Sequence, residues 1–190
     1  VAEGKNGGEF VLDFSKDKNV LYIEVSPKKG LQNDEARLFS NVNYLHNGAV
    51  PIGTPVLPQS YTGEGVIVGI IDQGFDYSHH LFFGQTGNNI NYRVKRVWNQ
   101  LDSLVMNPSP PAFGYGAEFT TSTTILGAIQ DYFPETHGTH VVGTAAGGYD
   151  SRLTGIAPES DIVLVSSDFE DAKLVDAIEY LMNYASSQNK

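Results

Sequence analysis

Two side chains that can exchange protons stand in informative sequence contexts. Asp72 follows the apolar run Val66–Ile71 and precedes Gly74 by two positions, and His137 opens the segment His-Gly-Thr-His-Val-Val-Gly. An imidazole accepts and returns protons near neutral pH, and a carboxylate can hold one of its two ring nitrogens. The two residue types therefore suit acid–base catalysis if the fold brings them together.

The same residues also allow plainer roles. Asp72 alone could be a turn residue at the end of a strand. His137 and His140 lie three positions apart and could bind a metal from one helix face. The zinc-protease spacing is His-Glu-x-x-His, however, and the sequence offers no convincing third ligand. The Asp-x-Gly context and the histidine segment together favour catalysis, and His140 is predicted to have a structural role.

These segments resemble the subtilisin-like serine peptidases. Residues 68–76, Val-Gly-Ile-Ile-Asp-Gln-Gly-Phe-Asp, are similar to the aspartate motif of the family, in which a hydrophobic strand ends in Asp-x-Gly. Residues 137–143 are similar to the histidine motif His-Gly-Thr-His-Val-x-Gly, and residues 155–158 follow as the Gly-Val-Ala-Pro of the family does. The resemblance covers residues 58–190, and its motifs occur in the order that the family uses.

The resemblance implies a catalytic triad of which this sequence carries two members. His137 would take a proton from a serine hydroxyl, and Asp72 would fix the imidazole tautomer and stabilise the imidazolium. No Gly-Thr-Ser-Met or Gly-x-Ser-x-Gly element occurs in the printed sequence, so the serine is expected beyond Lys190. We expect a serine endopeptidase acting on polypeptides, of which these residues are a part that is inactive alone. The alternative is a catalytically inactive subtilisin-like protein that binds or regulates another protease.

The sequence departs from the common family pattern at a calcium-binding position, and two other segments indicate a particular branch of the family. Where the family often has a calcium-binding carboxylate after the aspartate motif, this chain has Leu81. No cofactor is therefore assigned, and calcium stays open for the full-length protein. Residues 97–100 and 113–120 resemble elements of a clostridial and Bacteroides branch of the family.

The elements expected to position the pair form an α/β fold. Val66–Ile71 lacks apolar–polar alternation, which predicts a central strand buried on both faces of a parallel sheet, with Asp72 at its carboxyl end. We predict a buried helix from His137 to Gly148, a buried strand from Asp161 to Val165 and an amphipathic helix from Lys173 to Ser186. With the resemblance, this order predicts a truncated, parallel-sheet, subtilisin-like three-layer fold.

Two stretches lie outside this core pattern. Residues 1–30 read as a small amino-terminal β-hairpin, and the resemblance suggests the end of an inhibitory prodomain. Residues 31–190 would then form the incomplete catalytic domain. Within it, residues 84–135 lack a clear period and are predicted to be a long insert between two core elements.

Composition excludes several classes of function. The chain has 190 residues with a formal charge of -10, which repels a phosphate backbone, so we expect no nucleic-acid partner. It contains no cysteine, which excludes disulfides and thiolate catalysis. No apolar run is long enough to span a bilayer. The family resemblance favours an extracellular or cell-envelope location.

The expected truncation also predicts association. A sheet that stops after the strand Asp161–Val165 would leave an unpaired edge, and the helix Lys173–Ser186 would keep an uncovered apolar face. We expect the chain to associate with itself or with the missing carboxyl-terminal half of the catalytic domain.

Overall fold

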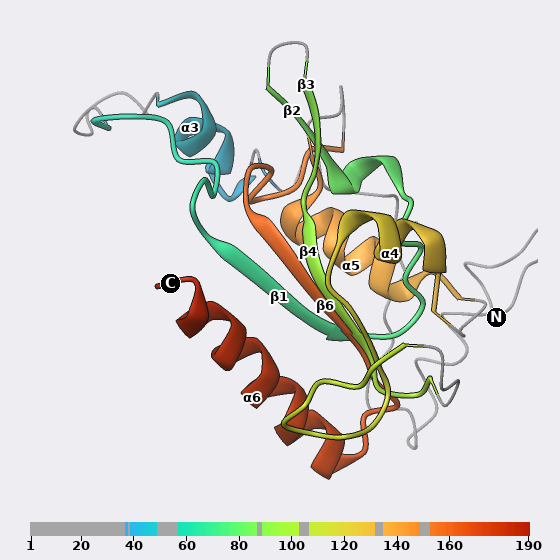
Figure 1. Cartoon of the computed structure of the whole chain (residues 1–190). Coiled ribbons are helices and arrows are strands. Elements are labelled where there is room, and N and C mark those ends of the chain that lie inside the picture. The colour runs from blue at the N-terminus through green and yellow to red at the C-terminus, as the bar shows by residue number, and fades with distance from the viewer. Residues whose placement is uncertain are drawn as a thin grey trace, which may run out of the picture. The chain divides into compact units, whose positions relative to one another are not determined.

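A four-stranded sheet organises the part of the chain that the structure describes (Figure 1). This computed structural model describes residues 37, 39–48, 57–86, 89–102, 107–131, 135–148 and 153–190. The hairpin predicted in residues 1–30 lies outside the described residues. The predicted domain boundary therefore stays a prediction.

The described part of the chain contains helices, strands and one 3-10 turn. In chain order they are α3 (Val42–Asn47), β1 (Ile67–Asp72), the 3-10 turn η1 (His80–Phe82), β2 (Phe83–Thr86), β3 (Asn89–Tyr92), β4 (Val94–Asn99), β5 (Ala117–Phe119), α4 (Ser122–Ala128), α5 (His137–Ala146), β6 (Asp161–Ser166) and α6 (Asp171–Ser187). The strands and helices predicted around both sequence motifs are confirmed to within two residues at nearly every boundary. No helix among the described residues is long and apolar enough to cross a bilayer.

The sheet has the order β1-β6-β4-β5. β6 runs parallel to both of its neighbours, whereas β5 is antiparallel to β4. In the register, Ser166 at the end of β6 lies opposite Asp72 of β1 and Asn99 of β4. Three strands therefore end at the same edge of the sheet, which is where parallel sheets place their functional groups. β2 and β3 form a separate antiparallel hairpin.

The sheet corrects three expectations. β1 was predicted to be central, but it lies at one side of the described sheet and is only half-buried, whereas β6 is buried along nearly its whole length between two neighbours. Among the described strands the edges of the sheet are therefore β1 and β5, and not β6, the strand that comes last in the sequence. Residues 84–135 are not all an insert either, because they contain β4, an interior strand of the sheet.

Successive side chains of a strand point to opposite faces of the sheet, and apolar side chains form a separate cluster on each face. The sheet and the helices on its two faces therefore make three layers. Ile162 and Leu164 of β6 pack with the cluster that includes Ile125 of α4 and Val142 of α5. Val163 and Val165 point the other way and pack with Trp98 and the side chains of α6. Helices α4 and α5 thus lie on one side of the sheet and α6 on the other (Figure 1). The predicted three-layer α/β architecture is confirmed.

Helix α6 carries more apolar surface than the sheet covers. Ala177 and Tyr180 are buried, and Gly69 lets β1 approach Leu181, since a Cβ at position 69 would lie 2.9 Å from Leu181 Cδ1. The next stripe of the helix is open to solvent. This stripe consists of Val175, Ile178 and Met182, which are 62%, 51% and 64% exposed, respectively. The apolar side of the helix is therefore wider than the part that packs against the sheet.

Candidate active site

Asp72 and His137 meet although they lie 65 positions apart. Nδ1 of His137 is 2.8 Å from Asp72 Oδ1 and 3.0 Å from Oδ2. An ionised carboxylate can only accept hydrogen bonds, so Nδ1 carries the donated proton. This leaves Nε2 as the ring nitrogen with a free lone pair. The described residues offer Nε2 no hydrogen-bond partner, and the side chain of His137 is 66% exposed, whereas that of Asp72 is 9% exposed.

The local backbone holds the Asp72 carboxylate in place. Asp72 is the last residue of β1, and its Oδ1 also accepts the amide of Gln73 at 2.8 Å. Its backbone carbonyl accepts the amide of Ser167 at 3.0 Å, directly after β6. The carboxylate is therefore buried at the edge where β1 and β6 end, with its oxygens turned toward α5.

Hydrogen bonds join the turn after β1 to the start of α5. The amides of Gly138 and Thr139 donate to the carbonyls of Gln73 and Gly74 at 2.7 and 3.0 Å. Thr139 Oγ1 also donates to the Gly74 carbonyl at 3.0 Å and accepts the amide of Asp76 at 2.7 Å. The first amides of a helix lack intrahelical acceptors. Since the side chain before His137 supplies no cap, the turn carbonyls cap this helix instead.

Two glycines make this close approach feasible. Gly74 has a φ of 79°, and a Cβ there would lie 2.2 Å from the carbonyl oxygen of Glu135. A Cβ at Gly138 would lie 2.6 Å from Cε1 of Phe75. The left-handed conformation and the lack of space at position 74 each require glycine. The chain can therefore turn sharply at Gly74, and α5 can begin in close contact with its neighbours at Gly138.

One comparison with known proteins identifies the family of this chain. A sequence model of the Subtilase family matches residues 63–190. The chain belongs to the subtilase family. Serine peptidase chemistry and polypeptide substrates are properties of that family. None of the curated proteins searched matches the sequence.

A solved protease structure has a similar fold. The structure of the Clostridium perfringens CspB protease is 24% identical in sequence and superimposes with a TM-score of 0.52. The match covers 68% of this chain and 28% of that protease. This chain therefore spans less than a third of the length of its structural neighbour, and the likeness concerns the fold. The predicted family and fold class are both confirmed.

One residue that holds the site together escaped the sequence analysis. Asp131 is buried, with an exposed fraction of 3%, and its carboxylate accepts the amides of Gly74 and Phe75 at 2.9 and 3.1 Å. It also accepts the hydroxyl of Ser166 at 2.7 Å. The sequence signal was weak because Asp131 lies in the stretch read as an insert, where an acidic residue usually indicates a solvated loop.

Three other histidines lie near these motifs in the sequence: His79, His80 and His140. His140 is on the exposed side of α5 and makes no side-chain hydrogen bond to the described residues, so its imidazole is not a structural anchor. The rings of His79 and His80 contact each other in a tilted arrangement, with centroids 4.5 Å apart and an interplanar angle of 39°. Burial, and then the neighbouring His80, lower the pKa of His79. No group of three or more possible metal ligands occurs among the described residues.

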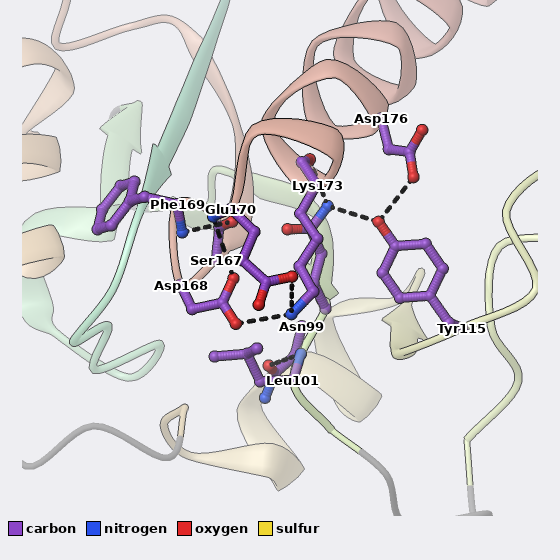
Figure 2. Close-up of polar contacts among 10 residues, drawn as sticks. Asn99, Leu101, Tyr115, Ser167, Asp168, Phe169, Glu170, Lys173 and Asp176 are labelled. Atoms are coloured by element: carbon purple, nitrogen blue, oxygen red, sulfur yellow. Dashed lines mark hydrogen bonds and ion pairs between the residues drawn. The ribbon is translucent and has the colours of Figure 1, made fainter.

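An acidic loop leads from the site edge into α6. Lys173 Nζ lies 2.6 Å from Asp168 Oδ2 and 3.3 Å from Glu170 Oε2 (Figure 2). The hydrogen bond from Lys173 lowers the pKa of Asp168. Asp168 Oδ1 also accepts the amide of Glu170. About one turn further along the helix, the hydroxyl of Tyr115 donates to Asp176 Oδ2 at 2.9 Å (Figure 2).

Replacement of Gly74 by alanine tests the turn. Gly74→Ala is expected to lower the free energy of unfolding by at least about 2 kcal/mol, because the new methyl group meets backbone and the φ is left-handed. The matched control is Gly127→Ala in α4, where a Cβ meets no atom within 4 Å. Gly127→Ala should raise stability by about 0.5–1 kcal/mol through helix propensity. Urea unfolding of both variants checks the pair, and equal effects at the two positions would contradict this account.

Proposed function

We propose that this subtilase is a serine endopeptidase in which Asp72 and His137 are two of the three triad residues. The observation that carries the proposal is the contact of His137 Nδ1 with both oxygens of a buried carboxylate. That contact leaves Nε2 exposed at the edge of the sheet, in the tautomer that a serine nucleophile needs. We propose that the serine comes from sequence beyond the 190 printed residues, since they contain no subtilase serine motif.

The proposed chemistry is acyl transfer. The serine Oγ would attack the carbonyl carbon of the scissile peptide bond while His137 Nε2 takes its proton. The Asp72 carboxylate would stabilise the imidazolium that forms, and it stays ionised throughout. His137 would then give the proton to the leaving amine, which leaves an acyl-enzyme. Water, deprotonated by the same Nε2, would release the acid product and restore the serine.

We also propose a substrate class and a cellular location. Extended polypeptides are the substrate class that the family chemistry implies, and the 190 residues alone are proposed to be inactive. An extracellular or cell-envelope location is proposed from the family resemblance. The alternative, an inactive subtilase that regulates another protease, requires another residue in place of the serine in the full-length gene.

We also propose that the free edge of β1 receives the segment that completes the domain. Among the described residues nothing pairs with the outer side of β1. The exposed stripe of Val175, Ile178 and Met182 continues the face of α6 that packs near β1. A strand added beside β1 would satisfy its backbone groups and bring apolar side chains over this stripe.

Removal of the negative charge of Asp72 tests the triad proposal. In the full-length protein, Asp72→Asn should lower kcat by about 10⁴-fold with little change in KM, because an amide favours the wrong imidazole tautomer. His140→Ala, one turn along the exposed side of α5, is the control and should keep full activity. Cleavage of an unstructured polypeptide such as casein provides the assay. Retention of more than a tenth of the activity in Asp72→Asn would contradict the proposal, and an inactive wild type would favour the regulatory alternative.

The edge proposal is tested by association of the 190-residue chain. Sedimentation should show a mass that rises with concentration, because the β1 edge and the α6 stripe are templates for association. The double variant Ile178→Lys with Met182→Lys should shift the association to higher concentration. Ile90→Lys is the matched control, since Ile90 is 75% exposed but lies on the β2–β3 hairpin. A wild-type chain that stays monomeric at all concentrations would contradict the proposal.

A further inference from the structure

The Asp131 carboxylate joins two parts of the site edge. Its Oδ2 accepts the Gly74 amide and the Ser166 hydroxyl, and its Oδ1 accepts the Phe75 amide. The Asp131 amide in turn donates to the Phe75 carbonyl at 3.1 Å. A buried carboxylate is costly unless donors of this kind satisfy it, and hydrogen bonds to a charged acceptor are the stronger ones. Asp131 therefore ties the turn after β1 to the end of β6.

This turn has almost no freedom left once Asp131 is in place. The amides of Gly74 and Phe75 bind Asp131, and the amide of Asp76 binds Thr139 Oγ1. The carbonyls of Gln73 and Gly74 bind the first amides of α5. The same turn is thus held from one side by Asp131 and from the other side by the helix that begins with His137. A shift of the turn would move both triad residues relative to each other.

A strained turn holds Asp131 itself. Ile129 has a φ of 67° and a ψ of -58°, and the amide of Gln130 donates to the carbonyl of Ala128 at 2.7 Å. These values describe a classic γ-turn, which is rare and strained in a β-branched residue. Ile129 is 58% exposed, so burial of its apolar side chain offsets little of the free-energy cost of this conformation. Strain of this kind persists where the surroundings require one geometry, and it concentrates at functional sites.

We propose that Asp131 is a positioning residue for the reaction, which sets the contact between Asp72 and His137 through the turn of residues 73–76. It acts without touching the substrate. The inference rests on the proposed function of the pair. An asparagine at position 131 has the same shape, but its NH₂ group would face backbone amides that need an acceptor. The turn would then relax, and the contact of His137 Nδ1 with Asp72 would loosen.

The test compares Asp131→Asn with Ile125→Ala in the full-length protease. Ile125 is fully buried in α4, so its truncation destabilises the same core without removing a hydrogen bond of the turn. Asp131→Asn should lower kcat by about 10²-fold, the scale of an ångström of misplacement, with KM changed less than threefold. Ile125→Ala should keep the wild-type kcat at a temperature where both variants are folded. Equal kcat values for these two variants would overturn the inference.

The pH profile supplies a readout that a merely stabilising residue would not move. A looser contact with the Asp72 carboxylate stabilises the imidazolium less, so the acidic limb of the kcat/KM profile should move to lower pH in Asp131→Asn. It should stay in place in Ile125→Ala. An unmoved acidic limb in Asp131→Asn would count against a positioning role.

Two further variants keep the test decisive. Ser166→Ala removes one hydrogen bond from the carboxylate and keeps its charge, so it should lower kcat by less than Asp131→Asn but by more than Ile125→Ala. If Asp131→Asn does not fold, the inference is tested by the kcat of Ser166→Ala alone. A wild-type kcat in Ser166→Ala would then overturn the inference. His137→Ala separates the two claims: retained activity there would defeat the proposed function, whatever Asp131 does.

Discussion

Hydrogen bonds between the turn of residues 73–76 and the first turn of α5 hold the site together. They bring the end of a strand and the start of a helix to contact distance across 65 positions of sequence. The helix needs acceptors for its first amides and the turn needs donors for its carbonyls, so each satisfies the other. Gly74 and Gly138 allow the backbones to approach this closely.

The sheet supplies the frame for this contact. Because β1, β6 and β4 are parallel, their carboxyl ends meet at one edge, and Asp72, Ser166 and Asn99 fall into register there. Asp131 reaches the same edge from the far end of a long connection and binds both the turn after β1 and Ser166 at the end of β6. The polar groups of the edge are thus buried and paired, while Nε2 of His137 is left for chemistry.

The sequence predicted the parts of the site whose signals are local. The apolar strand before Asp72, the small residues after His137 and the glycine at position 74 each have a direct physical meaning along the chain. The strand order could not be read in this way, since adjacency in the sheet depends on pairing over long separations. β4 was missed because its apolar and charged residues, Val-Lys-Arg-Val-Trp-Asn, follow no clear period. Asp131 was missed because only the fold reveals which acidic residues are buried.

If Asp72 sets the tautomer of His137, ¹⁵N NMR of the histidine ring shows it directly. We expect the neutral imidazole to carry its proton on Nδ1 and none on Nε2, with the Nδ1 proton protected from exchange by its hydrogen bond to Asp72. This signature should disappear in Asp72→Ala. A His137 ring that carries its proton on Nε2 in the wild-type protein, or one that is unchanged by the loss of Asp72, would contradict the account.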